Sequence, residues 1–187
     1  MTPLDAGKSG ALYGGPSFSL GNRAFRALWQ LTWLSLASWT PPQAHFWRRL
    51  LLRMFGARIG NGARIYGSAR VWYPPYLNVG SYSCVGPRAN IYCMAMVTIG
   101  NFVTISQDAE LCAGSHDLES KEFQLQARPI SIGDRAWIAA GAFVGPGAQV
   151  GEGAVLGARS VAFKCIPDWE VHVGNPASFL KKRVLRC

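Results

Sequence analysis

The sequence predicts an all-β fold, a parallel β-helix that follows an α-helical cap and precedes a short C-terminal helix. The first observation is an aliphatic residue that recurs at every sixth position, as at Ile59, Ile65 and Val71. The second is a small residue, mostly Ala or Ser, four positions after the aliphatic one. The third is the Gly that often follows the aliphatic residue, as in Ile59-Gly60. Neither the period of a helix nor that of a strand explains a recurrence of this length.

A β-helix explains the pattern because each group of six residues forms a short strand and a turn. The aliphatic side chain points into a narrow prism, the small side chain packs beside it, and Gly, Asn or Asp forms the corner. A single coil cannot bury its own core, so stacked neighbours complete it. We expect coils over residues 57–165, interrupted by a loop excursion at 117–131. The recurring aliphatic residues are Ile59, Ile65, Val71, Val79, Val85, Ile91, Val97, Ile99, Ile105, Leu111, Ile132, Ile138, Val144, Val150 and Leu156.

The segments before the repeat predict an arm and a helical cap. Residues 1–22 are rich in Gly, Ser and Pro and are expected to be flexible, whereas residues 23–56 form the cap. We expect one helix at 23–39, ended by two prolines, and a second at about 43–55. The first helix is shorter than the ~20 residues of a membrane span. Arginines before its apolar stretch also fit a secretion signal, but the long arm ahead of them argues against one.

The cap combines tryptophans with many arginines, and two roles remain open for it. Solenoids need a cap over their open end, and the apolar faces of these helices suit that role. A basic helix flanked by Trp also suits contact with an anionic membrane surface. A buried cap has no evident need for cations such as Arg48, Arg49 and Arg53 beside tryptophans, and this favours a membrane contact in addition.

Two further segments depart from the repeat. The Trp-Tyr-Pro-Pro-Tyr run at 72–76 either lines an acceptor site or packs against the helices. After Leu156 the repeat fades, and residues 166–187 are expected to form a turn and a basic tail. The Gly-Asn-Pro-Ala run at 174–177 predicts a rigid corner, and residues 178–187 predict a short helix.

Charge and cysteine content limit the function classes. The formal net charge is +9, which favours anionic partners such as phosphorylated cofactors or acidic membranes. No nucleic-acid-binding motif is present, so we expect no nucleic-acid partner. The five cysteines show no metal-ligand spacing, so we expect reduced thiols, no metal and a cytoplasmic protein, with a possible peripheral position at the inner face of the membrane.

The candidate for acid–base chemistry is His116, one of three histidines in the chain. It lies where a coil ends and the loop excursion begins. A neutral imidazole there can accept a proton from a hydroxyl or amine that attacks an acyl group. On position alone, a surface histidine in a turn is the favoured interpretation.

Several motifs together resemble a known family. They are Gly-Ser-His-Asp at 114–117, Pro-Ile-Ser-Ile-Gly at 129–133, Trp-Ile at 137–138 and the corner at 174–177. This set resembles the hexapeptide-repeat acyltransferases, among them the maltose, galactoside and nodulation O-acetyltransferases. The helices, Phe-Gly-Ala-Arg-Ile-Gly at 55–60 and Ile-Ser-Gln at 105–107 are more similar to the colanic acid, or exopolysaccharide, branch. The likeness spans roughly residues 20–185.

The resemblance implies a left-handed coil, a homotrimer and an acetyl-CoA groove between subunits. It gives His116 the role of general base and matches Asn90 to an active-site asparagine, although the spacing around Asn90 differs from that of the maltose enzymes. Many relatives carry Gly where Ala139 stands, and this puts the cofactor contact at that position in doubt. The residues matched to the cofactor groove are Ala139, Ala140, Gly157, Ala158 and Lys164, with Lys181 or Lys182 for the phosphates.

The resulting expectation is an acetyl-CoA-dependent O-acetyltransferase acting on a sugar hydroxyl in exopolysaccharide or lipid-linked oligosaccharide synthesis. The acceptor is then a sugar or a polyprenyl-linked sugar. An acetyltransferase for an antibiotic, an amino sugar or serine is an alternative, and so is a non-catalytic scaffold. A zinc carbonic anhydrase of similar fold is disfavoured because the histidines do not recur at coil spacing.

Overall fold

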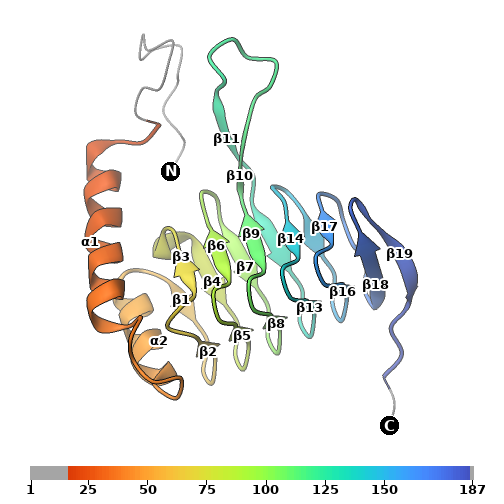
Figure 1. Cartoon of the computed structure of the whole chain (residues 1–187), viewed down its shortest axis with the longest axis horizontal. Coiled ribbons are helices and arrows are strands. Elements are labelled where there is room, and N and C mark those ends of the chain that lie inside the picture. The colour runs from red at the N-terminus through yellow and green to blue at the C-terminus, as the bar shows by residue number, and fades with distance from the viewer. Residues whose placement is uncertain (1–16, 186–187) are drawn as a thin grey trace.

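Three parallel sheets form the sides of a prism in the computed structural model, which describes residues 17–185 (Figure 1). The first sheet contains β1 (Arg58–Ile59), β4 (Leu77–Val79), β7 (Val97–Ile99), β12 (Ile130–Ile132) and β15 (Gln149–Val150). The second contains β2 (Arg64–Ile65), β5 (Cys84–Val85), β8 (Thr104–Ile105), β13 (Trp137–Ile138), β16 (Val155–Leu156), β18 (Glu170–Gly174) and β19 (Ala177–Lys182). The third contains β3 (Arg70–Val71), β6 (Asn90–Tyr92), β9 (Glu110–Cys112), β14 (Phe143–Val144) and β17 (Val161–Ala162). The predicted parallel β-helix is therefore confirmed.

The core follows the sequence repeat. Every recurring aliphatic side chain is buried, and in the second sheet Ile65, Val85 and Ile105 stack on successive coils. Most of the small partners are buried beside them, whereas Ser115 is exposed because it lies on a strand that leaves the prism. The recurring Gly is explained by close approach of the next coil. A Cβ on Gly80 would lie 2.4 Å from the carbonyl carbon of Gly100.

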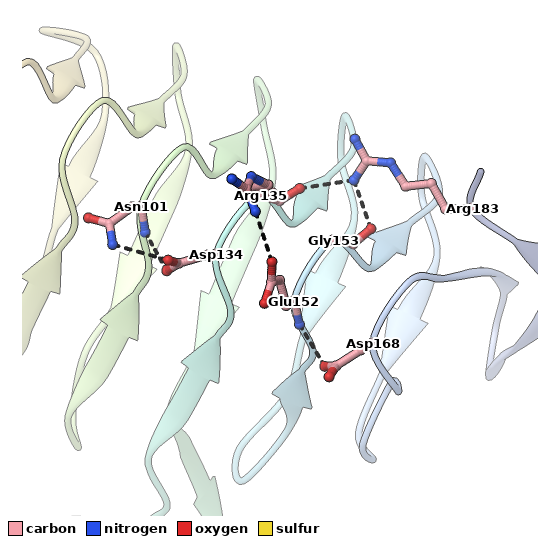
Figure 2. Close-up of polar contacts among 7 residues, drawn as sticks. All are labelled: Asn101, Asp134, Arg135, Glu152, Gly153, Asp168 and Arg183. Atoms are coloured by element: carbon pink, nitrogen blue, oxygen red, sulfur yellow. Dashed lines mark hydrogen bonds and ion pairs between the residues drawn. The ribbon is translucent and has the colours of Figure 1, made fainter. Parts of the chain in front are cut away.

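Side-chain carboxyl and amide groups join the coils at the corner between the first and second sheets (Figure 2). Asp134 Oδ1 accepts a hydrogen bond from the backbone N of Asn101 at 2.8 Å, and Asp168 Oδ1 accepts one from Glu152 N at 2.8 Å. The bonds from Asn101 hold the pKa of Asp134 below its ordinary value. These bonds satisfy backbone donors at turns, where no strand partner is available.

Two helices cover the N-terminal end of the prism. They are α1 (Leu20–Leu36) and α2 (His45–Met54), close to the predicted positions, and a short 3-10 helix, η2 (Pro74–Tyr76), follows later. The helix α1 begins three residues before the expected boundary at Arg23, because Ser19 Oγ accepts a hydrogen bond from Asn22 N and caps it. The predicted arm therefore reaches at most Ser19, and its residues 1–16 lie outside the described part of the chain.

The first coil, at the end of the prism beneath these helices, has a row of backbone carbonyls that face no other coil. Within the prism, N–H groups of one coil donate to carbonyls of the next, as Tyr66 N does to Val85 O at 3.1 Å. The second-coil carbonyls that accept from the first coil belong to Val79, Ser83, Val85, Ala89 and Ile91. The corresponding carbonyls of the first coil have no preceding coil to serve them. Buried and unpaired, each would cost about 1–3 kcal/mol.

Side chains of α1 and α2 take the place of that missing coil. The donor and acceptor pairs are Arg53 with Ile59 (2.9 Å), Arg49 with Ala63 (2.8 Å), Arg48 with Ile65 (2.9 Å), Trp33 with Ala69 (3.1 Å) and Trp29 with Val71 (2.7 Å). Arginine and tryptophan suit this task because both reach across an apolar surface and carry N–H donors at the far end. The premise that a buried cap does not need arginines beside tryptophans is therefore wrong.

The C-terminal segment is a β-hairpin, so the predicted short helix is wrong. The strands β18 and β19 pair antiparallel around the Gly-Asn-Pro-Ala turn, and β18 adds to the second sheet beside β16. Lys182 Nζ donates to Glu170 Oε1 at 2.7 Å across the hairpin. Arg183 then donates to the carbonyls of Arg135 and Gly153 at 2.9 and 2.7 Å, which fastens the tail to the coils (Figure 2). Sheet pairing thus overrides the local helical propensity of the tail.

Candidate active site

His116 is the last residue of β10, the first strand of a hairpin that projects from the prism (Figure 1). The strands β10 (Gly114–His116) and β11 (Leu125–Ala127) pair antiparallel, so the predicted excursion is an ordered hairpin rather than a plain loop. The chain leaves after β9 of the third sheet and returns to β12 of the first. His116 therefore lies at the corner between the third and first sheets.

The loop of this hairpin orients the imidazole. The rings of His116 and Phe123 stack with centroids 4.2 Å apart and planes inclined by 11°. Nδ1 of His116 lies 2.8 Å from the carbonyl oxygen of Phe123. A carbonyl oxygen only accepts hydrogen bonds, so we assign the proton of the neutral ring to Nδ1. Nε2 is then left with its lone pair, which is the form that a general base requires.

His116 opens into a cavity of about 500 Å³ between the hairpin and the start of α1. This volume lies within the range of small-molecule sites. Its lining residues are Ser17, Phe18, Arg23, Arg26, Trp72, Tyr92, His116 and Leu125. The Arg26 guanidinium lies 4.3 Å from the ring centroid of Trp72, and burial raises the pKa of the Tyr92 hydroxyl. Two roles were left open for the aromatic run at 72–76, and its residues divide between them. Trp72 lines the cavity. Tyr73 packs against α1, with its ring centroid 5.3 Å from that of Phe25.

Asn90 lies elsewhere within the single chain. It begins β6 in the third sheet, where its Nδ2 donates to Glu110 Oε1 at 3.0 Å on the next coil. It borders a second cavity, of about 420 Å³, formed beneath α1 around Trp29 and Trp33. Trp72 lines both cavities, whereas Asn90 lines only the second and His116 only the first.

The small residues predicted to bind cofactor are brought together. Ala139 and Ala140 form the turn between the second and third sheets, and Gly157 and Ala158 form the same turn one coil later. Hydrogen bonds stack these turns, with Ala139 N donating to Leu156 O and Arg159 N to Ala140 O, both at 2.9 Å. A strip of small side chains thus runs along one corner of the prism.

The predicted lysines lie at the other two corners. Lys164 follows β17 and precedes the first sheet, on the same corner as His116. Lys181 and Lys182 pair with the start of β18, at the corner between the first and second sheets. Within one chain, therefore, His116, the strip of small residues and the terminal lysines occupy three different corners.

Two parts of the site were not predicted from the sequence: the two arginines of α1 and the carbonyl that orients His116. Arg23 and Arg26 appeared only as a polar stripe on an apolar helix, although their spacing of three places them on one helical face. Phe123 lies in a loop whose sequence carries no periodic signal. The role of its carbonyl depends on the fold of the hairpin and could not be read from the residue type.

Burial makes two of the described cysteines poor nucleophiles. Cys84, Cys93, Cys112 and Cys165 are free thiols within the described residues, and Cys187 lies outside this part of the chain. Burial raises the pKa of Cys93 to about 12 and also raises that of Cys112, the cysteine nearest His116 in sequence. A thiol in this state is a poor nucleophile.

Two other findings concern residues 17–185 only. No group of three or more His, Cys, Asp and Glu side chains there is arranged to hold a metal ion. No helix in that range combines the length and the hydropathy needed to cross a membrane.

Comparison with known proteins connects this geometry to a family. Residues 129–162 match the family model described as bacterial transferase hexapeptide (six repeats). The chain is 42% identical over 167 residues to the Escherichia coli (strain K12) protein named as the colanic acid biosynthesis acetyltransferase WcaF, covering 89% of this chain and 92% of that protein.

Two solved structures share the fold. A maltose O-acetyltransferase from Clostridium difficile 630 matches with a TM-score of 0.80 at 23% identity, covering 89% of this chain and 90% of that chain. A hexapeptide-repeat acetyltransferase from Vibrio cholerae O1 biovar eltor, complexed with acetyl coenzyme A, matches with a TM-score of 0.81 at 20% identity, covering 96% and 98%. The repeat, the hairpin histidine and the sequence identity agree, and the chain belongs to the hexapeptide-repeat acetyltransferases.

Proposed function

We propose that the protein transfers the acetyl group of acetyl-CoA to a sugar hydroxyl in exopolysaccharide or lipid-linked oligosaccharide synthesis, with His116 as general base. The observation that carries this proposal is the bond between His116 Nδ1 and the carbonyl of Phe123, which leaves Nε2 free to accept a proton beside a cavity of ligand size. The relative named for colanic acid biosynthesis supports the pathway, and the neighbour complexed with acetyl-CoA supports the acetyl donor.

The reaction needs one proton relay. The oxygen of the acceptor hydroxyl attacks the thioester carbonyl and forms a tetrahedral intermediate, while Nε2 takes the proton of that hydroxyl. The intermediate then expels the CoA sulfur, and the imidazolium returns the proton to it. The carbonyl of Phe123 accepts from Nδ1–H throughout and stabilises the charged ring. For Asn90 we retain the proposal of an active-site contact, reached from a neighbouring subunit.

The test of this function is transfer of labelled acetyl from acetyl-CoA to a panel of free, nucleotide-linked and polyprenyl-linked sugars. The expected result is an O-acetyl product with at least one sugar and release of one CoA thiol per ester formed. Acetylation confined to amines, antibiotics or serine would replace this function with the alternative acceptor class.

We further propose a homotrimer in which each site is shared by two chains. The three-corner arrangement supports it, since His116 and the strip of small residues lie on different corners of one prism. In a closed ring, the corner of one chain meets a different corner of its neighbour. Acetyl-CoA then lies along Ala139, Ala140, Gly157 and Ala158 of one chain, and Lys164 or Lys181 is available for its phosphates. Lys182 is already paired with Glu170.

Shared sites predict recovery of activity in mixed trimers. His116→Ala removes the base, and Ala158→Glu places a carboxylate at the exposed position of the strip of small residues, so each variant alone should be inactive. After subunit exchange, a site that combines the intact histidine of one chain with the intact corner of another should work, giving roughly a quarter of the wild-type rate. The measurement is the rate of acetyl transfer before and after subunit exchange. Sedimentation gives the mass of the assembly in each sample. No recovery in a mixed trimer would place the whole site within one chain.

Contact with a membrane surface remains a proposal, but the residues proposed to make it are no longer the arginines. Arg48 is fully buried, and Arg49 and Arg53 donate to coil carbonyls, so reversing them would damage the cap rather than test membrane binding. Leucines of α1 are exposed instead, with Leu31 at 63% and Leu34 at 66%. Exposed apolar side chains on a helix at one end of the prism suit an interfacial contact.

This version predicts that wild-type protein floats with anionic vesicles and that Leu31→Ser with Leu34→Ser abolishes flotation. The matched control is Leu180→Ser, which removes a leucine that is 56% exposed on β19, at the opposite end of the prism (Figure 1). If all three proteins floated equally, or if the wild type did not float, α1 would have no role at the membrane and would serve only as the cap of the prism.

A further inference from the structure

Within the described residues, the side chains of two arginines of the helical cap donate no hydrogen bond to a carbonyl of the first coil. Arg48, Arg49 and Arg53 each donate to one of its carbonyls. Arg23 and Arg26, on α1, line the His116 cavity instead. The structural need that accounts for the other cations does not account for these two.

The cavity around them holds uncompensated positive charge. No carboxylate is among its described lining residues, and the guanidinium of Arg23 has no hydrogen bond or ion pair within residues 17–185. Arg26 donates from Nε to Asn22 Oδ1 at 2.9 Å and stacks on Trp72, which leaves its remaining N–H groups for another acceptor. Burial and the charge of Arg23 both lower the pKa of Arg26. Two like charges on adjacent turns of a helix are unfavourable unless an anion joins them.

We propose that this cavity is the acceptor subsite and that it binds an anionic sugar through Arg23 and Arg26. The anion is either the carboxylate of an acidic sugar or the phosphate of a sugar phosphate or diphosphate-linked sugar. This inference rests on the proposed function, because it takes His116 as the base that the acceptor hydroxyl must reach.

The position of the arginines favours the acceptor over the phosphates of CoA. The base must lie at the thioester, and the phosphates of CoA lie at the other end of the pantetheine arm. Cations that share one cavity with the base are therefore on the acceptor side of the reacting carbon. The strip of small residues and the predicted lysines lie on the CoA side in the proposed trimer.

The same cavity can orient the sugar ring. Arginine forms paired hydrogen bonds with carboxylate or phosphate, which fix direction as well as distance. Trp72 and the half-buried Tyr92 offer aromatic surface between Arg26 and His116. An acceptor held by its anion against these rings presents a hydroxyl toward Nε2 in one orientation, and this would determine which position is acetylated.

The test is calorimetric binding of three sugars to the CoA-bound protein: methyl glucuronide, glucose 1-phosphate and neutral methyl glucoside. We expect the wild type to bind at least one charged sugar at least ~10-fold more tightly than the neutral one. The two charged sugars distinguish carboxylate from phosphate. Arg23→Gln and Arg26→Gln should each weaken binding of that sugar about 10–100-fold, since each removes charge-assisted hydrogen bonds. Affinity for the neutral sugar and for CoA should not change.

Two further variants keep the result interpretable. Arg64→Gln removes the same charge from an exposed residue of β2 outside the cavity and should have no effect. Arg26→Lys retains the charge and should retain most of the preference, even if Arg26→Gln proves unstable. Equal binding of charged and neutral sugars, no binding of any, or a parallel loss of CoA affinity would overturn the anion site. Failure of acetyl transfer with anion binding intact would instead overturn the proposed reaction.

Discussion

His116→Ala is expected to reduce acetyl transfer by about 10²–10⁴-fold while the fold and acetyl-CoA binding remain intact. Loss of a general base typically has this effect, which corresponds to ~3–5 kcal/mol in the activation barrier. The side chain is exposed, and within residues 17–185 its hydrogen bond and its ring stacking are both with Phe123, so we expect its removal to leave the prism intact. The measurement is single-turnover transfer, with acetyl-CoA affinity determined separately.

The matched control is Ser115→Ala on the same strand. Ser115 is also exposed, and we expect near-normal rates because its hydroxyl has no role in the proton relay. If folded His116→Ala protein turned over at the wild-type rate, the histidine would have no part in the mechanism, and the bond to Phe123 would be only a device that closes the hairpin. Loss of transfer together with loss of acetyl-CoA binding would mean that His116 holds the cofactor instead.

Arg48→Met is expected to lower the free energy of unfolding by about 3–5 kcal/mol, the range seen when a buried charged network is broken. Arg48 is fully buried, and its guanidinium donates to the carbonyls of Thr40, Pro41, Pro42 and Ile65. Methionine fills part of the volume but takes away the donor to the carbonyls of Thr40 and Pro42, and each buried unpaired group costs about 1–3 kcal/mol. The carbonyls of Pro41 and Ile65 keep a second partner, Ala44 N and His45 Nδ1 respectively. Denaturant unfolding at fixed protein concentration measures the difference.

Arg64→Met serves as the control for this change. Arg64 has the same side chain on an exposed position of β2, and surface substitutions of this kind usually fall within about 0.5 kcal/mol. Equal stability of the two variants would show that the Arg48 hydrogen bonds contribute nothing beyond those that water provides.

The β-helix could be predicted from the sequence because its stabilising contacts repeat. Each coil needs an aliphatic side chain at the position of Ile65, Val85 and Ile105, so the requirement recurs in the chain as a fixed spacing. The hairpin was visible for the opposite reason, as an interruption next to His116. Both signals are local in sequence. The β-helix was confirmed, and the interruption corresponds to the β10–β11 hairpin, which begins at Gly114 rather than at residue 117.

The cap and the tail could not be predicted in the same way. The role of Arg48 depends on a match between one helix face and carbonyls of the first coil, such as that of Ile65, and no sequence spacing records it. The tail contains Phe-Leu-Lys-Lys at 179–182, which suits a helix or a strand, and the available edge of β18 decides. The acidic partner of Lys182, Glu170, becomes visible only once that pairing is known.

The closed ends of the prism have a consequence for how copies of this protein meet one another. A β-solenoid with bare ends presents unpaired backbone on which another chain can continue the sheets, and repeated addition of this kind produces a fibre. Here arginine and tryptophan side chains occupy the first-coil carbonyls, and an antiparallel strand carrying Lys181 covers the last coil of the second sheet. Continuation of the sheets by another chain is therefore opposed at the first coil and, in the second sheet, at the last coil. Association is left to the long sides of the prism, where it can stop at a closed ring.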